Sequence, residues 1–429
     1  MIEKTLRIAK KIIPKRIFAF FQPAYHYLLA LCAAAIYGRP SRGIFIVGVT
    51  GTKGKTTTVE LINAMLEAAG YKTAVFGTLR MKIGDASKPN LHKMTMPGRL
   101  FAQRFIKRAK DAGCDYVIME MTSEGAKQFR HKFINLDTLI FTNLSPEHIE
   151  AHGSYEHYRD AKLSIARELA RSSKKRRTLI VNGDDPESRH FLAIRNIPRK
   201  ISYHMRDIRP FEKTKTGIAF TLHGQHAVTR LEGEFNLYNI LAAATFAKSQ
   251  NIPEEIILKI VKETETIPGR MEHIREGQNF DVVVDYAHTP DSLEKAYRAF
   301  GGRSKICVLG SAGGGRDIWK RSAMGEIADT YCDRIILTDE DPYDEDPKKI
   351  VSDVAAGITK HKPEIIMDRR KAIARALSAA VDGAVVIITG KGTDPYIMRA
   401  DGKKEPWSDA RVTREELRRI RRKTETTRL

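Results

Sequence analysis

The residues with the clearest chemical potential stand in the stretch IVGVTGTKGKTTT, close to the start of the chain. Gly51 and Gly54 let the backbone turn so that successive N–H groups can point at phosphate oxygens. Lys55 would add positive charge at the outer phosphates, and the Thr56 hydroxyl could bind Mg²⁺. The strict form of this motif has glycine where this chain has Val49. The pattern predicts binding of ATP or GTP; an ordinary glycine turn is the alternative.

One further residue could hold a metal ion. Glu120 ends the apolar run DYVIME, near the phosphate loop if the sheet has the expected order, and a carboxylate there suits Mg²⁺. A carboxylate on the surface at a strand end is the alternative.

The elements that must position these residues alternate between strand and helix. The apolar runs GIFIVGVT, KTAVFGT, DYVIMEMTS, DTLIFTNLS and RTLIVNG predict strands, and helical spacing follows in 55–69, 98–113 and 155–170. A second alternating set is formed by FDVVVDY, SKICVLGS, DRIILTDEDP, PEIIMD and AVVIITGKG. The pattern predicts an α/β protein whose mostly parallel sheet is covered on both faces.

Three segments follow from this pattern. Residues 1–42 are basic and apolar and are predicted to be helical, and residues 43–267 form the ATP-binding domain. The chain pauses at Pro268–Gly269, so residues 268–429 are predicted to form a Rossmann-like α/β domain. A chain of 429 residues is too long for a single core.

Net charge and cysteine content indicate the charge of the binding partner and the redox state of the compartment. The net charge of +21 indicates an anionic substrate or partner, although basic termini that only aid solubility would also explain much of it. The four cysteines show no CxxC pair, so a disulfide framework or a zinc ribbon is not expected and a reducing cytoplasm is predicted.

The segment 17–38 contains no charged residue. It is almost long enough to cross a bilayer, but Gln22, Pro23 and His26 interrupt it. Helices packed on the following domain, attachment to a membrane surface and a true span all remain open here.

The motifs taken together resemble the Mur ligases, ATP-dependent enzymes that form the amide bonds of the peptidoglycan stem peptide. GVTGTKGKTTT is similar to their ATP loop, including its departure from the strict motif. MEMTSEG, TNLSPEHIEAHGSYEHYRDAK, LEGEFNLYNILAA, PGRMEHI, DYAHTPDSLEKA and GKGTDPY are similar, in order and spacing, to the MurE branch, which adds the third residue of the stem. The resemblance covers roughly residues 43–416.

The resemblance implies an ADP-forming ligase that adds an amino acid to a UDP-N-acetylmuramoyl-peptide through an acyl phosphate. It also implies ATP and Mg²⁺ as cofactors and no nucleic-acid partner. Because the attacking carboxylate and the γ-phosphate are both anionic, such a site must neutralise charge and align the reactants.

The resemblance also implies a role for each residue. Lys55, Glu120, His148 and Lys162 would be the catalytic set, and all but Lys55 would join Thr56 in holding metal ions. His148 follows an apolar run in SPEHIEAHG, and His152 could compete with it for the role. The family carries the lysine matched by Lys162 as a carbamate, an anionic oxygen ligand; an exposed helix lysine is the alternative.

Nucleotide contacts would come from the loop and from five residues further along the chain. The loop residues are Gly51, Thr52, Lys53, Gly54, Lys55, Thr56 and Thr57. Asn236 and Asn239 would face the adenine, or could instead cap a helix. Arg270 would reach the γ-phosphate, Asp285 the ribose and His288 the base, so closure of the two domains would complete the site.

Substrate contacts are expected at five positions. Thr122 and Ser123 stand where the family has two serines, and the family's histidine beside them is replaced by Glu124. In TDEDPYDEDP, Asp341 and Tyr343 replace the Asn and Arg of the family's diaminopimelate loop.

A phenol cannot pair with a distal carboxylate, so diaminopimelate is disfavoured, and the acids Asp339, Glu340 and Asp341 suggest a cationic side chain such as lysine. Asp394 could hold the α-amine. A solvated acidic loop is the alternative for these acids.

The family's N-terminal uridine-binding domain of ~100 residues has no counterpart in the 42 residues before Gly43. The acceptor could therefore be a UDP-linked or a lipid-linked muramoyl-peptide, with peripheral contact of residues 1–42 at the inner membrane surface. A folylpolyglutamate or polyamide ligase remains a rival interpretation, and so does an inactive ATP-binding protein.

Overall fold

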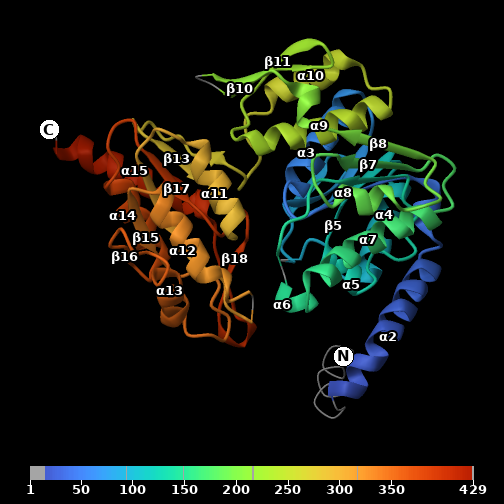
Figure 1. Cartoon of the computed structure of the whole chain (residues 1–429), viewed down its shortest axis with the longest axis horizontal. Helices are drawn as coiled ribbons and strands as arrows, with labels where there is room; N and C mark the ends of the chain where they lie inside the picture. The colour runs from blue at the N-terminus through green and yellow to red at the C-terminus, as the bar shows by residue number, and fades with distance from the viewer. Residues whose placement is uncertain (1–14, 93, 148, 215–216, 316, 428–429) are drawn as a thin grey trace. The chain divides into compact units, whose positions relative to one another are not determined.

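The computed structural model describes residues 15–92, 94–147, 149–214, 217–315 and 317–427, without the side chains of 15–20 and 423–427. The chain forms two compact units (Figure 1). Unit 1 comprises Met1–Leu144, Glu156–His204 and Leu241–Ile257, and unit 2 comprises Ser145–Tyr155, Met205–Ile240 and Leu258–Leu429. The domain boundaries expected from the sequence remain a prediction.

Unit 1 is built on an eight-stranded sheet in the order β4-β3-β2-β5-β1-β6-β7-β8. The strands are β1 (Phe45–Thr50), β2 (Thr73–Phe76), β3 (Arg80–Ile83), β4 (Ala86–Pro89), β5 (Tyr116–Met121), β6 (Thr138–Phe141), β7 (Thr178–Asn182) and β8 (Arg199–Tyr203). In this order, every neighbouring pair from β2 across to β8 is parallel. At the other edge, β3 pairs antiparallel with β2, and β4 pairs antiparallel with β3. Because β1 lies between β5 and β6, the segments that leave these three strands emerge at one edge of the sheet.

Most helices of unit 1 connect these strands, and α2 precedes the first of them. They are α2 (Lys15–Ile36), α3 (Lys55–Ala68), α4 (Arg99–Asp111), α5 (Ser123–Lys127), α7 (Tyr155–Arg171) and α8 (Ser188–Leu192), with a 3-10 turn η1 at Pro40–Gly43. Two helices, α9 (Glu234–Ser249) and α10 (Glu254–Glu263), have residues in both units. The helices predicted at 55–69, 98–113 and 155–170 are thus confirmed within two residues at each end.

Unit 2 contains a small antiparallel sheet and a larger, mostly parallel one. The small sheet has the order β11-β10-β9 and comprises β9 (Phe211–Thr214), β10 (Gly217–Leu222) and β11 (Gln225–Thr229). The larger sheet has the order β12-β13-β17-β14-β15-β16. Its strands are β12 (Glu272–His273), β13 (Asp281–Val284), β14 (Lys305–Leu309), β15 (Arg334–Leu337), β16 (Glu364–Ile365) and β17 (Val385–Ile388).

Helices cover both faces of the larger sheet. They are α11 (Pro290–Ala299), α12 (Lys320–Tyr331), α13 (Pro347–Ala355), α14 (Arg369–Ser378) and α15 (Asp409–Thr427). Val283 and Ile387 face one core, which contains side chains of α11, α12 and α13, whereas Val284 and Ile388 face another, with side chains of α14 and α15. This alternation follows from the two-residue period of a strand, and it confirms the predicted α/β class.

The remaining described elements of unit 2 are short. They are α6 (Ile149–His152), η2 (Met205–Ile208), η3 (Ala400–Gly402) and the hairpin of β18 (Tyr396–Met398) and β19 (Lys404–Pro406). Among the described helices of the whole chain, none combines the length and the apolarity that a bilayer crossing requires.

The described structure contains one disulfide that the sequence analysis did not anticipate. Cys307 on β14 and Cys332, directly after α12, form a disulfide with their Cα atoms 6.1 Å apart. Both are buried, whereas Cys32 is exposed and Cys114 is buried, and these two are free. The sequence did not indicate this bond because 25 residues separate the partners, and only the packing of α12 on β14 brings them together.

Candidate active site

The predicted phosphate loop connects β1 to α3 and has the expected backbone. Gly51 and Gly54 have φ angles of 147° and 82°, in the region that favours glycine. A Cβ on Gly51 would lie 2.0 Å from Thr142 Oγ1, so the loop needs glycine there for space as well. Asn143 accepts the amide hydrogen bonds of Thr52 and Lys53, at 2.8 and 2.9 Å. The residues after β6 therefore support the loop.

Two lysine side chains meet at one carbonyl group of this loop. Lys55 Nζ donates to the Gly51 carbonyl oxygen at 2.9 Å and to that of Thr52 at 2.8 Å. Lys162 Nζ, on α7, donates to the same Gly51 oxygen at 2.8 Å. The Lys162 side chain is buried, with 2% of its surface exposed, so the alternative of an exposed helix lysine is wrong.

Tyr158 connects α7 to the loop. Its hydroxyl lies 2.8 Å from Thr52 Oγ1, and Lys162 Nζ lies 4.8 Å from the centre of its ring. Tyr158 was not predicted from the sequence. Its position four residues before Lys162, on the same helix face, was the available signal.

Glu120 lies beside the loop as predicted. It pairs in register with Val49 of β1, and its carboxylate accepts from the Thr56 hydroxyl at 3.1 Å. The amide and hydroxyl of Thr78 donate to the two carboxylate oxygens at 2.7 and 2.9 Å. Glu120 is 1% exposed, so the alternative of a surface carboxylate is wrong. The partnership with Thr78 was not predicted from the sequence.

The residues directly after β5 form the start of α5. The Thr122 side chain accepts from the Gly125 amide at 3.1 Å and so caps this helix. Ser123 is buried and Glu124 is exposed. Thr56 and Thr57, at the start of α3, are also buried.

The predicted metal-binding residues are described only in part. His148 lies outside the described residues, and the segment that contains it belongs to unit 2, whereas Glu120 and Lys162 belong to unit 1. Among the residues with described positions, no three His, Cys, Asp or Glu side chains gather as a metal site would require. Glu120 and Thr56 nevertheless bring a carboxylate and a hydroxyl oxygen together, which are ligands that suit Mg²⁺.

Unit 2 contains the other predicted nucleotide residues. Asn236 and Asn239 lie in the first turns of α9, are both 4% exposed and are linked by a hydrogen bond of 2.9 Å from Asn239 Nδ2. Asn236 Nδ2 also donates to the Glu232 carbonyl oxygen at 2.7 Å. Both side chains therefore form hydrogen bonds at the start of this helix.

Arg270 precedes β12, and Asp285 and His288 follow β13. The Arg270 guanidinium lies 4.3 Å from the ring centre of Tyr286. Asp285 accepts from the amides of Met271 and Ala287 at 2.8 and 2.7 Å. His288 Nε2 lies 3.1 Å from Glu147 Oε1, and Lys320 Nζ donates to the His288 carbonyl oxygen at 3.0 Å.

The acids predicted to receive a cationic substrate have cationic partners within unit 2. Asp341 accepts from Lys391 Nζ at 2.8 Å, and Lys391 also contacts Asp394 at 3.3 Å. Asp339 pairs with Arg399. Asp339 and Asp341 are both buried, so the alternative of a solvated acidic loop is wrong. Because each of them already has a cationic partner, the pairings weaken the expectation that these acids select lysine. The sequence offered no signal for them, because the partners are 50 and 60 residues away.

Glu340, between these two acids, is also buried. Burial raises the pKa of its carboxyl group, an effect that Arg369 partly offsets. A Cβ on Gly390 would lie 2.1 Å from Glu340 Oε2, and Gly390 has a φ of 105°. The carboxyl group thus fills the space that a side chain at 390 would need.

Tyr343 has an unusual backbone for its type, with a φ of 53°. Its amide donates to the Met398 carbonyl oxygen at 3.1 Å, and its ring lies where a Cβ on Gly314 would clash at 2.9 Å. The phenol therefore packs on the glycine-rich segment GSAGGGRDIWKR. In that segment Arg316 lies outside the described residues, and Arg321 is buried and pairs with Glu345 and Asp353.

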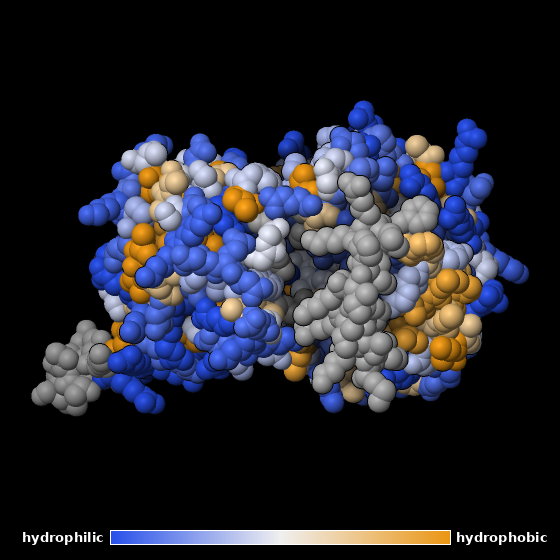
Figure 2. Space-filling view, turned by 90° about the horizontal axis from the view of Figure 1, so that it is seen from below, coloured by the Kyte–Doolittle hydropathy of each residue, from blue (hydrophilic) through white to orange (hydrophobic). Residues whose placement is uncertain are grey.

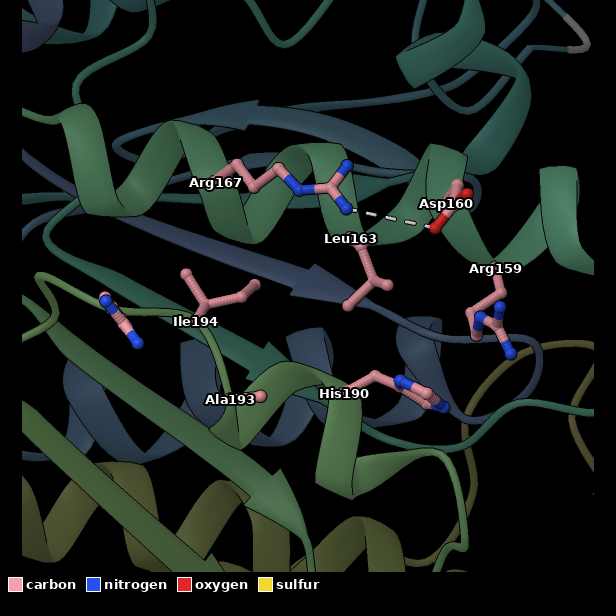
Figure 3. Close-up of a pocket in the computed structure, with 8 residues that line it drawn as sticks. Arg159, Asp160, Leu163, Arg167, His190, Ala193 and Ile194 are labelled. Atoms are coloured by element: carbon pink, nitrogen blue, oxygen red, sulfur yellow. Dashed lines mark ion pairs between the residues drawn. The ribbon is translucent and has the colours of Figure 1, made fainter.

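A cavity of about 430 Å³ lies beside α7 and α8 (Figure 3). It is lined by Arg159, Asp160, Leu163, Arg167, His190, Ala193, Ile194 and Arg195. Figure 3 shows Arg167 directed at Asp160, with 3.9 Å between their closest charged atoms. No residue predicted for the active site lines this cavity.

Comparison with known families gives two matches along the chain. The model for the Mur ligase middle domain matches residues 49–247, and that for the Mur ligase glutamate ligase domain matches residues 269–392.

Curated relatives match across most of the chain. A protein of Geobacillus kaustophilus named UDP-N-acetylmuramoyl-L-alanyl-D-glutamate–2,6-diaminopimelate ligase is 40% identical over 86% of this chain and 78% of its own length. A Roseiflexus protein named UDP-N-acetylmuramyl-tripeptide synthetase is 37% identical over 92% of this chain and 82% of its own length.

Solved structures match as well. A UDP-N-acetylmuramoyl-L-alanyl-D-glutamate–2,6-diaminopimelate ligase aligns with a TM-score of 0.60 and 28% identity, over 88% of this chain and 79% of the other. A Mycobacterium tuberculosis folylpolyglutamate synthase aligns with a TM-score of 0.69 and 16% identity, over 86% and 93%. At that identity the second likeness shows the fold alone.

Proposed function

Since the chain belongs to the Mur ligase family, we propose that it adds an amino acid to a UDP-N-acetylmuramoyl-peptide during peptidoglycan synthesis. As a member of that family it is an ATP-dependent, ADP-forming ligase that makes an amide bond. The observation that carries the proposal is the convergence of Lys55 and Lys162 on the carbonyl of Gly51, with Glu120 held beside the loop by Thr56.

The chemistry proceeds in two displacements. A carboxylate oxygen of the acceptor attacks the γ-phosphorus of ATP, the bond to the bridging oxygen breaks, and ADP leaves with that electron pair. The amine of the amino acid then attacks the acyl carbon; a C–N bond forms, phosphate departs, and the ammonium loses its proton. The first step brings two anions together, so cations and aligned N–H groups must lower its barrier.

The loop residues suit the first displacement. We assign to Lys55 the task of balancing charge at the transferred phosphoryl group, and to the loop residues from Gly51 to Thr57 the binding of the phosphates. Mg²⁺, when bound, would balance further phosphate charge, and Thr56, Glu120, His148 and a carbamylated Lys162 are its proposed ligands. Asn236, Asn239, Arg270, Asp285 and His288 are proposed to contact the nucleotide.

The test is phosphate release by the full chain with ATP, UDP-N-acetylmuramoyl-L-alanyl-D-glutamate and a panel of amino acids, with product mass as second readout. We expect release only when both acceptor and amino acid are present, and we expect Lys55→Ala to lower it by about 100-fold or more. Lys88→Ala, at an exposed position of β4, is the matched control. Release that needs neither co-substrate would refute the ligase assignment for this acceptor.

The choice of amino acid is proposed from Tyr343. Diaminopimelate, which the Geobacillus kaustophilus relative uses by its name, has a distal carboxylate, and the phenol at 343 offers it no cation. We therefore propose that this chain prefers an amino acid without a distal carboxylate, and that Thr122, Ser123, Asp341 and Asp394 contribute to substrate binding.

Replacing Tyr343 with Arg tests this preference. We expect Tyr343→Arg to raise kcat/KM for diaminopimelate by about tenfold relative to lysine, since a guanidinium–carboxylate pair contributes ~1–3 kcal/mol. Tyr343→Phe is the control and should leave the ratio unchanged. A wild-type chain that already favours diaminopimelate would contradict the proposal.

Two further acceptors are compared in the same assay. A lipid-linked muramoyl-peptide replaces the UDP-linked one in one arm, and a folate with glutamate replaces both substrates in another. The folate arm is included because a folylpolyglutamate synthase shares the fold. We propose that the enzyme works in the cytoplasm, where ATP is available, and that residues 1–42 contact the inner membrane face.

A further inference from the structure

Helix α2 carries a stripe of apolar side chains that face solvent. Phe21, Tyr25, Leu28 and Ile36 are 61%, 40%, 58% and 68% exposed, and Cys32 is exposed as well. Their spacing of four, three, four and four residues follows one face of the helix. We call these five residues the α2 stripe. Figure 2, which views the molecule from below, shows apolar side chains gathered on the surface of unit 1.

The opposite face of α2 is fixed by packing within unit 1. Ala30, Ala33 and Ala34 are at most 1% exposed, and the helix packs against α4. The ring of Tyr27 meets that of Phe133 edge to face, with centroids 5.2 Å apart. Because this face is committed to the fold, the α2 stripe cannot turn inward and lies on the exposed face of the helix.

Charge is arranged around the stripe rather than in it. No charged residue occurs from 17 to 38. Arg39 and Arg42 are exposed just beyond the carboxyl end of α2. Before its amino end, the sequence from 1 to 16 contains six lysine or arginine residues and one acid, Glu3. An uncharged apolar stripe therefore has cations at both ends.

We propose that helix α2 lies in the plane of an anionic phospholipid surface. The side chains of the α2 stripe would lie below the headgroups, and the flanking cations would lie among the phosphates. An amphipathic helix with basic residues binds membranes in this way. The proposal rests on the membrane contact included in the proposed function, and it identifies the residues, the orientation of the helix and the lipid charge. It does not depend on which acceptor the ligase uses.

The charge arrangement argues against pairing with a second copy. In an antiparallel pair of stripes, the amino end of α2 in one copy, where Lys15 and Arg16 stand, would meet Arg39 and Arg42 of the other. In a parallel pair, the cations at each end of α2 would meet the same cations of the other copy. Both arrangements bring like charges together, whereas an anionic bilayer offers opposite charge at both ends.

Vesicle flotation of the full chain tests the proposal. We expect binding to phosphatidylglycerol–phosphatidylcholine vesicles, at least tenfold weaker binding to phosphatidylcholine alone, and release by salt. The variant Phe21→Ser/Tyr25→Ser/Leu28→Ser should lose binding by at least tenfold. The matched control Ile365→Ser/Val381→Ser, at exposed apolar positions of unit 2, should bind as the wild type does.

A label on Cys32 reports the orientation independently of affinity. Cys32 is the exposed free cysteine, whereas Cys114 is buried and Cys307 is bonded to Cys332. A nitroxide at Cys32 should gain access to oxygen and lose access to a polar nickel reagent when vesicles are added. A nitroxide that stays equally accessible to the nickel reagent would overturn the proposed orientation.

The outcomes separate this proposal from the ligase function. Equal vesicle binding by wild type and the triple variant would overturn it, and so would a wild-type dimer that the triple variant converts to monomer without any vesicle binding. Phosphate release with the soluble UDP-linked acceptor should be unchanged in the triple variant. Loss of vesicle binding and loss of ligase activity are thus independent results.

Discussion

Lys162 has the most unusual environment among the predicted site residues. Its ammonium and that of Lys55 donate to one carbonyl oxygen, and its side chain is buried. Two cations at such short range repel one another, particularly away from water. Conversion of one amine to a carbamate would replace this repulsion with attraction and provide an anionic oxygen for Mg²⁺.

We therefore predict that activity depends on CO₂. Phosphate release by the wild type should fall in CO₂-depleted buffer and return when bicarbonate is added. Lys162→Ala should lose about 100-fold or more, with recovery of some activity by a small carboxylate such as acetate. Lys162→Arg retaining full activity would contradict the carbamate, because a guanidinium cannot form it.

His131 is a second residue whose environment changes its chemistry. Burial, with a smaller contribution from Lys132, lowers the pKa of its imidazole to about 3. The contact from Ser164, 3.4 Å from His131 Nε2, opposes this shift only weakly. His131 is 1% exposed, so it stays neutral in the folded protein at pH values where an unfolded histidine is already charged.

The sign of the resulting pH dependence follows from proton linkage. Between pH 6.5 and about 3 the unfolded chain binds a proton that the folded chain does not, so stability falls as pH falls through this window. We expect the free energy of unfolding of unit 1 to drop by up to ~1.4 kcal/mol per pH unit more in the wild type than in His131→Gln. Urea unfolding at several pH values between 4 and 7 measures this difference. Parallel pH curves for the two proteins would show that His131 does not contribute.

At the scale of elements, a buried ion pair joins two helices on one face of the larger sheet. Arg369 is the first residue of α14 and Asp409 the first of α15, and both are at most 3% exposed. Arg369 Nε and an outer guanidinium nitrogen donate to the two oxygens of Asp409 at 2.8 and 2.7 Å. Trp407 Nε1 donates to one of these oxygens at 2.7 Å.

Removing one partner of this pair should be costly. We predict that Asp409→Ala lowers the free energy of unfolding by about 3–5 kcal/mol, because it leaves a guanidinium unpaired away from water. The double variant Arg369→Met/Asp409→Leu should lose less than Asp409→Ala. Arg411→Ala, which breaks an exposed pair with Glu415 on the same helix, should cost less than ~1 kcal/mol. Denaturant unfolding provides all three values, and a loss below ~1 kcal/mol for Asp409→Ala would contradict the argument.

At the scale of the whole molecule, the net charge of +21 is the dominant property. A field of this sign attracts a UDP-linked acceptor, which carries phosphates and a carboxylate, but not a zwitterionic amino acid. Salt screens this attraction over about 10 Å at 0.1 M.

We expect the KM for the UDP-linked acceptor to rise by about threefold or more between low and moderately high salt, while the KM for the amino acid changes little. Steady-state kinetics at fixed ATP and Mg²⁺, with sodium chloride varied, measures both values. An equal rise in both would attribute the salt effect to the catalytic step or to the protein's stability instead.

Local patterns in the sequence were sufficient for the alternation of strands and helices and for the glycine turn between β1 and α3. Buried parallel strands are continuous apolar runs, and a glycine turn before a helix is a short-range feature. The same reasoning missed β3, β4 and the sheet of β9, β10 and β11. All four residues of β4 are exposed and β9 has three exposed residues, so no apolar pattern marks these two strands. The strand β10, by contrast, is the apolar and largely buried segment GIAFTL.

The sequence by itself determined which chemical groups are present and in what local order, because backbone turns and helical faces depend on near neighbours. Only the tertiary structure decided which polar and charged groups meet. Lys162 and the Gly51 carbonyl that it contacts are 111 residues apart, and Asp339 and Arg399 are 60 apart. Burial and pairing of this kind depend on packing between distant elements, and no local spacing encodes them. For that reason the glycine turn between β1 and α3 was predictable, whereas the internal pairing of the acidic segment 339–341 was not.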